Sequence, residues 1–223
     1  YDKQAEAVLR ADEARVTLRL LSLLSAPETS IDEILLTGAH VDVVRRADGS
    51  WNYDDIGADD GKPSTFEGRI RVADATANVD TNGNVYELRA ITGTVDIDRS
   101  DVSYDLTGAL SGVPLRVRGT YVGGTQELDL SATDTDGMPL LKYLPESSLP
   151  EEIHVDTLHA DRVHMEMRRV DGVTTFDGHV DGVHGTADIY GTKTDLQTSA
   201  FRFNEREVFL AATAEAEGQR ARV

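Results

Sequence analysis

Apolar and polar residues alternate in short runs along most of this chain of 223 residues. The run RVTLRL places Val16, Leu18 and Leu20 on one side of an extended strand, and the same spacing recurs in GRIRV, GTVDID, PLRVRG and QELDL. Successive side chains of a β-strand point to opposite faces, so this period of two predicts strands. A strand buried on both faces would read as a continuous apolar run. The alternation therefore predicts an antiparallel sheet with one apolar and one charged face.

Turn signals separate these runs, and two segments interrupt the pattern. The sequences ADGS, TNGN and VDG fall between expected strands, where hairpin turns need residues that tolerate positive φ. LRLLSLLSAPE clusters leucines before Pro27, and GMPLLKYLPESSLP sets leucines between prolines. We expect a short helix or helical turn in each segment, covering an open end of the sheet or its apolar side.

The chain also resembles itself. The stretch from Ala73 to Ile97 aligns with the stretch from Ala160 to Ile189, and the matched residues are Ala73-Asp74 with Ala160-Asp161, Gly83 with Gly172, and Gly93-Thr94 with Gly185-Thr186. Repeated strand sets that add edge to edge give a sheet that grows with copy number. We therefore expect an all-β fold, an elongated and curled, mostly antiparallel sheet with an apolar inner face and one or two short helices.

Charge and composition exclude several classes of partner. The chain has 22 Lys and Arg against 40 Asp and Glu, a formal net charge of -18, which repels nucleic acid and anionic lipid headgroups at long range. It has no cysteine, so disulfides and thiolate chemistry are excluded, and either a reducing cytosol or a Gram-negative envelope suits it. No apolar run approaches the roughly 20 residues of a membrane-spanning helix. The chain begins at Tyr1 without a signal-like segment, so we expect a fragment whose anchor lies elsewhere.

Candidate catalytic and metal-binding residues do not form recognisable motifs. Histidines at 154, 159 and 164, with others at 179 and 184, are spaced by five, and an odd spacing sends side chains of one strand to opposite faces. The aspartates of DDIGADDG and TDTDG do not match the spacing of a calcium loop. No nucleophile elbow, phosphate-binding loop or zinc-protease motif is present. We expect no enzyme activity, no catalytic residues, no cofactor and no metal.

The order of several segments resembles a known family. ARVTLRLLSLLS is followed by SIDEILLTGAHVDVVRRADGSWNYDDI, then by LTGALSGVPLRVRGTY and ELDLSATDTDGMPLLKYLP. This order is similar to that of the AsmA/TamB-like envelope proteins, and the resemblance runs from about Arg15 to Pro145, with looser repeats to Val223. The Trp-Asn block is its sharpest part.

The resemblance implies a periplasmic body, a β-groove or β-taco, held in the inner membrane by an N-terminal helix that this chain lacks. It implies phospholipid movement toward the outer membrane and a part in outer-membrane biogenesis. We expect one β-groove segment with three sub-units, an N-terminal AsmA-like hairpin region over 1–62, a first β repeat over 63–145 and a second over 146–223.

The apolar face is the remaining candidate for function. An acyl chain of about 16 carbons would gain up to roughly 12 kcal/mol there, at about 0.8 kcal/mol per methylene. The expected lining residues are Val41, Val43, Ile70, Val72, Val95, Ile97, Leu106, Leu115, Val117, Leu128, Leu130, Val163, Met165 and Met167.

Two alternatives stay open from the sequence. One is an assembly factor that adds strands of outer-membrane β-barrel partners to its sheet edges. The other is a structural β-sandwich surface domain that buries the apolar face as a core.

The single tryptophan follows a predicted turn. Trp51 comes directly after ADGS and before Asn52 and Tyr53. A large ring at this place can fold over the apolar rim of a sheet, while the amide of Asn52 bonds backbone groups of the irregular exit. We expect Trp51 and Asn52 to act as a structural staple.

Overall fold

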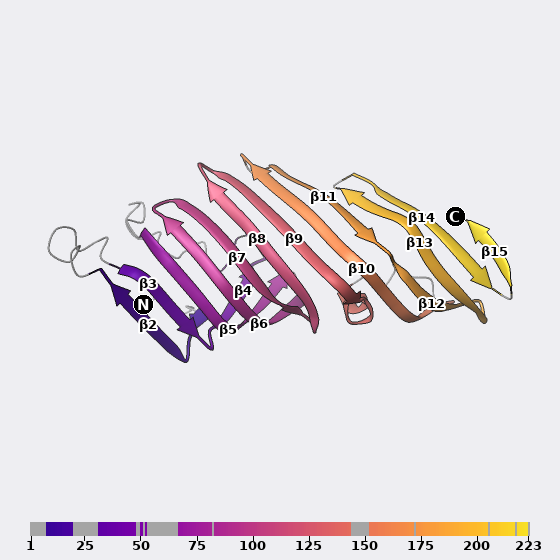
Figure 1. Ribbon diagram of the computed structural model, residues 1–223, viewed down its shortest axis with the longest axis horizontal. Coiled ribbons are helices and arrows are strands. Elements are labelled where there is room, and N and C mark those ends of the chain that lie inside the picture. The colour runs from indigo at the N-terminus through magenta and orange to yellow at the C-terminus, as the bar shows by residue number, and fades with distance from the viewer. Residues whose placement is uncertain are drawn as a thin grey trace. The chain divides into compact units, whose positions relative to one another are not determined.

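A computed structural model describes residues 8–19, 31–47, 50, 52, 67–81, 83–143, 152–171, 173–204, 206–216 and 218–222. These residues form fifteen strands of one mostly antiparallel sheet, with a short 3-10 helix, η2 (Met138–Tyr143) (Figure 1). The all-β, curled and mostly antiparallel fold expected from the sequence is confirmed. The sandwich alternative is wrong as a fold, because the described strands belong to one sheet and not to two packed sheets.

One of the two expected helical segments is described. η2 lies inside GMPLLKYLPESSLP, and its Pro139 occupies the early position that proline tolerates. In LRLLSLLSAPE, Leu18 ends a strand, and residues 20–30 lie outside the described part. The expected boundaries at 62 and 145 also fall outside it.

The chain divides into two compact units. Unit 1 comprises Tyr1–Ser111 and Arg118–Gly124, and unit 2 comprises Gly112–Val117 and Thr125–Val223. The boundary passes through β8 (Val113–Val122). Each unit is described by itself below.

Unit 1 is built from strands that bend at a shared line, which we call the corner. Its strands are β1 (Leu9–Arg10), β2 (Glu13–Leu18), β3 (Ile31–Thr37), β4 (His40–Arg45), β5 (Glu67–Thr81), β6 (Asn84–Asp98) and β7 (Asp101–Leu110). β3 and β4 both run parallel to β5, one on each side of the corner, and β1 and β2 flank them in the same way. The other pairs in the unit are antiparallel.

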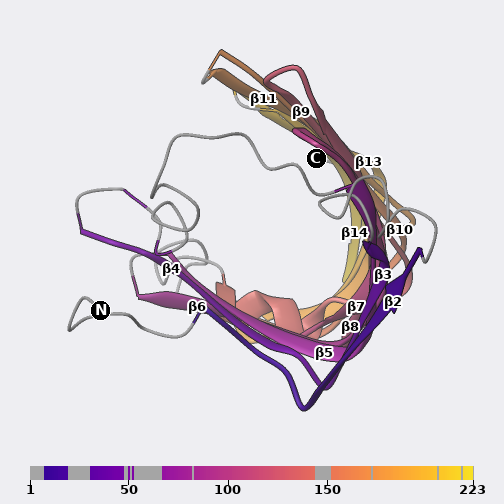
Figure 2. The same ribbon diagram turned by 90° about the vertical axis from the view of Figure 1, so that its left-hand side faces the viewer.

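Irregular backbone makes the corner of unit 1. The β5–β6 register shifts on both sides of Ala75, and Asp74 and Ala90 take positive φ values of 53° and 52°. Such bulges bend a strand sharply. Ala39 and Ala75 are each 3% exposed at this line. Figure 2 shows the resulting curvature of β5 and β6.

Unit 2 repeats this construction. Its other strands are β9 (Thr125–Asp136), β10 (Ile153–Val170), β11 (Val173–Asp181), β12 (His184–Ile189), β13 (Thr192–Asn204), β14 (Val208–Ala216) and β15 (Gln219–Arg222). β11 and β12 pair with the two halves of β10, as β3 and β4 do with β5, but they run antiparallel to it. Ala160 and Ala187 are buried near the bend. Gly182 has φ 61° between β11 and β12, and its bare Cα leaves room for the side chain of Asp161.

The aligned residues of the internal repeat occupy similar places in the two units. Asp74 of β5 and Asp161 of β10 both lie at the bend, in the first strand of a long hairpin. A Cβ atom at Gly93 or at Gly185 would collide with a backbone carbonyl of the neighbouring strand, that of Asp105 and that of Thr157 respectively. These glycines are needed because two backbones approach closely there.

Candidate functional site

The strand register gathers apolar side chains on one face of unit 1. Ile34 pairs with Ile70, Ile70 with Val95, and Val95 with Tyr104, which makes one row across four strands. A second row of four joins Leu36, Val72, Gly93 and Leu106. Side chains of directly opposed residues lie on the same face of a sheet. Val72, Ile70, Val95 and Leu106 are thus neighbours although they lie far apart in the sequence.

The same face continues beyond the corner of unit 1. Val41 pairs with Ala77, and Ala77 with Leu88. Val43 pairs with Val79, and Val79 with Tyr86. The expected lining residues of unit 1 therefore fall into two groups, one on each side of the bend, with Ile97 at the end of β6 opposite Val102.

Unit 2 carries an apolar face of its own. Leu130 pairs with Met165 and Met165 with Gly178, while Leu128 pairs with Met167. Val163 lies opposite Ala132 and Val180. Leu115 and Val117 alternate with the exposed Arg116 and Arg118 in β8.

A cluster of three phenylalanines extends the face of unit 2 and was missing from the expected lining. The rings of Phe176 and Phe203 are 6.3 Å apart and those of Phe201 and Phe203 are 5.9 Å apart, measured between centroids. Gly178 lies directly beneath Phe203, so that any side chain there would collide with the ring. The alternation in SAFRFN marks Phe201 and Phe203 as residues of one face, but the approach of Phe176 depends on the β11–β13 register.

The lining side chains are half-buried. Each of the fourteen expected residues is of intermediate exposure, and none is buried. The buried apolar residues of the described part are five alanines and Val113. A close-packed core would instead enclose its large apolar side chains. In the described residues, the apolar side chains of these faces are therefore only partly covered.

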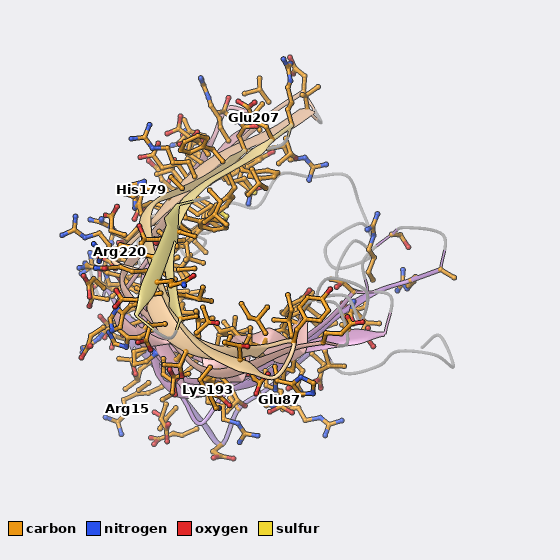
Figure 3. The ribbon with its side chains drawn as sticks, turned by 90° about the vertical axis from the view of Figure 1, so that its right-hand side faces the viewer. Arg15, Glu87, His179, Lys193, Glu207 and Arg220 are labelled. Atoms are coloured by element: carbon orange, nitrogen blue, oxygen red, sulfur yellow. The ribbon has the colours of Figure 1, made fainter. Side chains whose placement is uncertain are left out.

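The opposite face is charged. In Figure 3, Arg15 points outward from the convex side of unit 1, and His179 and Arg220 point outward from the convex side of unit 2. Arg15 alternates with Val16 and His179 with Val180, so the apolar faces are on the concave side. Cross-strand ion pairs populate the convex side, among them Arg69 with Asp96 at 2.7 Å and Arg99 with Glu67 at 2.8 Å. Hydrogen bonds to these carboxylates raise the pKa of Arg69 and of Arg99.

The convex face also holds a shallow hollow of about 580 Å³ in unit 1. Arg19 and Arg69 line it together with acidic residues that include Asp32, Glu33 and Asp96. Arg19 and Arg69 are engaged with Asp32 and Asp96, at 2.8 and 2.7 Å. The hollow is thus lined by exposed ion pairs of the sheet surface, and we assign no chemistry to it.

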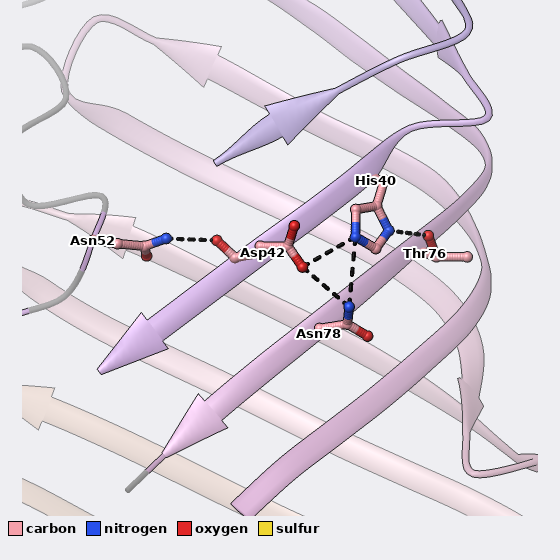
Figure 4. Close-up of polar contacts among 5 residues, drawn as sticks. All are labelled: His40, Asp42, Asn52, Thr76 and Asn78. Carbon is pink, nitrogen blue, oxygen red and sulfur yellow. Dashed lines mark hydrogen bonds and ion pairs between the residues drawn. The ribbon is translucent and has the colours of Figure 1, made fainter. Parts of the chain in front are cut away.

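Asn52 closes an open backbone edge of β4. Its Nδ2 donates to the carbonyl of Asp42 at 2.7 Å (Figure 4). Its Oδ1 accepts from the amide of Val44 at 3.0 Å. Its own amide donates to the carbonyl of Val44. Asn52 therefore imitates a paired strand along this edge. Trp51, the other expected staple residue, lies outside the described residues.

A polar network flanks this edge. His40 contacts Thr76 Oγ1 through Nδ1 at 2.7 Å and Asp42 through Nε2 at 3.0 Å, and Asn78 donates to the same Asp42 carboxylate at 3.0 Å (Figure 4). The β4–β5 register places His40 opposite Thr76 and Asp42 opposite Asn78. These contacts tie two parallel strands together.

The histidines of unit 2 meet across strands. The ring centroids of His159 and His184 are 4.8 Å apart, and those of His164 and His179 are 5.2 Å apart. Reasoning from spacing along one strand considers only neighbours in sequence, so it missed both pairs. His154 lies farther along β10, opposite Asp188.

Together, these features define an all-β protein whose sheet is charged on its convex side and apolar on its concave side. No known protein family, curated protein or solved structure matches the chain. Within the described residues, no helix has both the length and the apolar character needed to cross a membrane.

Proposed function

We propose that this chain is the periplasmic part of an AsmA/TamB-like envelope protein, anchored in the inner membrane by a segment outside it. In this proposal its concave apolar faces shield phospholipid acyl chains during transport from the inner to the outer membrane, which serves outer-membrane biogenesis. The observation that carries the proposal is the half-buried state of the fourteen lining residues. The resemblance in the Trp-Asn block and the following segments adds to it.

The free energy of apolar burial favours an acyl chain that moves along the face over one that is held at a single position. Burial of apolar surface is worth roughly 25 cal/mol per Å², and it does not depend on direction. The rows of Val, Ile, Leu, Met and Phe present similar surface from strand to strand, so an acyl chain meets no single deep well. The proposed function therefore needs no covalent chemistry and no cofactor.

Two variants of neighbouring residues test the proposal. Phe176 belongs to the concave face, and Thr175, exposed and next to it on β11, belongs to the convex face opposite Arg168. Phe176→Glu places a charge where acyl chains would lie, whereas Thr175→Glu adds the same charge beside an arginine. We expect protein purified from cell envelopes without detergent to carry phospholipid in native mass spectra. The Phe176→Glu variant should lose at least several-fold of it, as should Leu130→Glu, and Thr175→Glu should retain it.

A different result would point to another use of the sheet. Strand addition at the edges formed by β2 or β15 depends on backbone groups and not on the concave face. If strand addition is the function, the Phe176→Glu and Thr175→Glu variants should not differ in the phospholipid that they carry. Wild-type protein free of phospholipid, or equal phospholipid on both variants, would reject lipid shielding, provided that circular dichroism shows the variants folded.

A further inference from the structure

Three potential metal ligands meet on the convex face of unit 2. Nδ1 of His164 lies 3.6 Å from a carboxylate oxygen of Asp129, and Nε2 of His164 lies 3.3 Å from Oε1 of Glu166. One ligand atom from each of the three residues can be chosen so that all lie within 4.8 Å of one another. Among the residues that the structure describes, this is the one such group of three.

The sheet register fixes this group in place. Glu166 of β10 lies directly opposite Asp129 of β9, and His164 precedes Glu166 by two residues on the same face. On the concave side, Leu130 lies opposite Met165 and Leu128 opposite Met167. A slip of β10 by one residue would turn Met165 and Met167 to the convex side. The packing of the concave face therefore also holds the three polar residues together on the convex face.

The local charge favours a cation. Glu166 is opposed by Asp129 on one side and by Asp177 of β11 on the other, so three carboxylates share one row across three strands. Like charges directly opposite one another destabilise a sheet. The row before it holds Ser131, His164 and His179, with Arg202 of β13 opposite His179, and the row after it holds Arg168 opposite Glu127. A bound cation would relieve the repulsion among the carboxylates.

The donor set indicates which cation. Imidazole nitrogen suits Zn²⁺, Cu²⁺ and Ni²⁺ and is a poor ligand for Ca²⁺ and Mg²⁺, while carboxylates complete many zinc sites. Zinc bonds of about 2.0–2.2 Å place tetrahedral ligand atoms roughly 3.2–3.6 Å apart. The side chain of Glu166 is 72% exposed, so it is free to move the short distance that closes the group.

We propose that Asp129, His164 and Glu166 form a zinc site, with water completing the coordination. The site is separate from the proposed lipid-shielding face, since it lies on the opposite side of the same strands. It also departs from the expectation of a chain without metal, which considered ligands along single strands. Asp129 is far from His164 in sequence, and only the β9–β10 pairing brings them together.

Calorimetric titration with ZnCl₂ tests the site. The full chain is first treated with a chelator, and excess MgCl₂ is present to occupy weak acidic sites. We expect one Zn²⁺ per chain, with affinity at least tenfold weaker in His164→Gln and weaker in Asp129→Asn and Glu166→Gln. His159→Gln is the matched control, because the His159 ring also lies against a second histidine ring and contacts Asp134 at 3.2 Å but belongs to no group of three.

Two outcomes would overturn the proposal. One is equal zinc affinity in the wild type and in His164→Gln, and the other is an equal loss in His159→Gln. Glu166→Gln changes an exposed side chain, so it remains a folded test even where His164→Gln alters the circular dichroism spectrum. Unchanged affinity in Glu166→Gln would remove Glu166 from the site and reduce the group below three ligands.

Discussion

The side chain of Asn52 makes hydrogen bonds at the edge of β4 that a neighbouring strand would otherwise make. Its amide group bonds the carbonyl of Asp42 and the amide of Val44, and Asn52 is only 9% exposed. Buried backbone groups that lose their partners cost about 1–3 kcal/mol. β1 pairs with this edge at His40 and Val41, and Asn52 bonds the part that follows, at Asp42 and Val44.

Asn52→Ala should lower the free energy of unfolding by about 1–3 kcal/mol, because it leaves one donor and one acceptor of β4 without their partner. Urea unfolding followed by circular dichroism measures the change. Asn52→Asp should be no better, since its carboxylate cannot donate to the carbonyl of Asp42. The control is Asn84→Ala at an exposed position, and a loss in the control equal to that of Asn52→Ala would contradict the assigned role.

At the scale of the elements, the long strands bend because neighbouring strands bend at the same place. In unit 2, Gly182 separates β11 from β12, opposite the bend of β10 near Asp161. Gly182 serves two needs, a φ of 61° and space for the side chain of Asp161. Gly191 serves only the first, with φ 80° and open space around it.

The two glycines allow these needs to be separated. Gly191→Ala should cost about 1–2 kcal/mol of stability, the ordinary penalty for a side chain at positive φ. Gly182→Ala should cost about 1–3 kcal/mol more, because its Cβ also collides with Asp161. Adding Asp161→Ala should recover part of the excess, as measured by urea unfolding, because it removes the carboxylate but leaves the Cβ of residue 161 at 2.8 Å. Equal losses at the two glycines would show that the contact with Asp161 does not matter.

The sequence predicted which face of the sheet a side chain lies on better than it predicted which residues are neighbours across strands. Alternation is a local property, so the concave and convex residues of single strands such as Ile70 and Arg69 could be assigned without a structure. Pairings such as Leu130 with Met165, or His164 with His179, depend on register across strands and were not accessible. The contribution of Phe176 and the closing role of Asn52 on β4 depend in the same way on contacts between distant segments.

The chain as a whole carries a formal charge of -18, and most charged side chains of the described residues are exposed or half-buried. Exposed ion pairs such as Arg15 with Glu13 contribute little, about 0–1 kcal/mol each. Repulsion among the excess carboxylates opposes the folded state over a longer range. The balance between these two effects decides how stability responds to salt.

Raising NaCl from 50 to 500 mM should increase the thermal midpoint, because shortening the Debye length from roughly 14 Å to about 4 Å screens the net repulsion more than it weakens short ion pairs. Differential scanning calorimetry measures the midpoint. KCl at the same ionic strength should give the same shift of the midpoint. Sucrose is uncharged, so it shows how much of the shift arises without charge screening. A midpoint that falls with salt would mean that the ion pairs dominate.

The alanines at the bends have a consequence for how such a chain can change over time. Ala187 is fully buried and Ala39 and Ala75 nearly so, and a larger side chain at a buried position forces its neighbours to move. The lining side chains elsewhere on the concave side are only half-buried, so exchanges among Val, Ile, Leu, Met and Phe should meet less steric resistance there. Substitutions should therefore be tightly restricted at the buried alanines of the bends. Between the bends, residues of different size should be tolerated on the concave side as long as they are apolar.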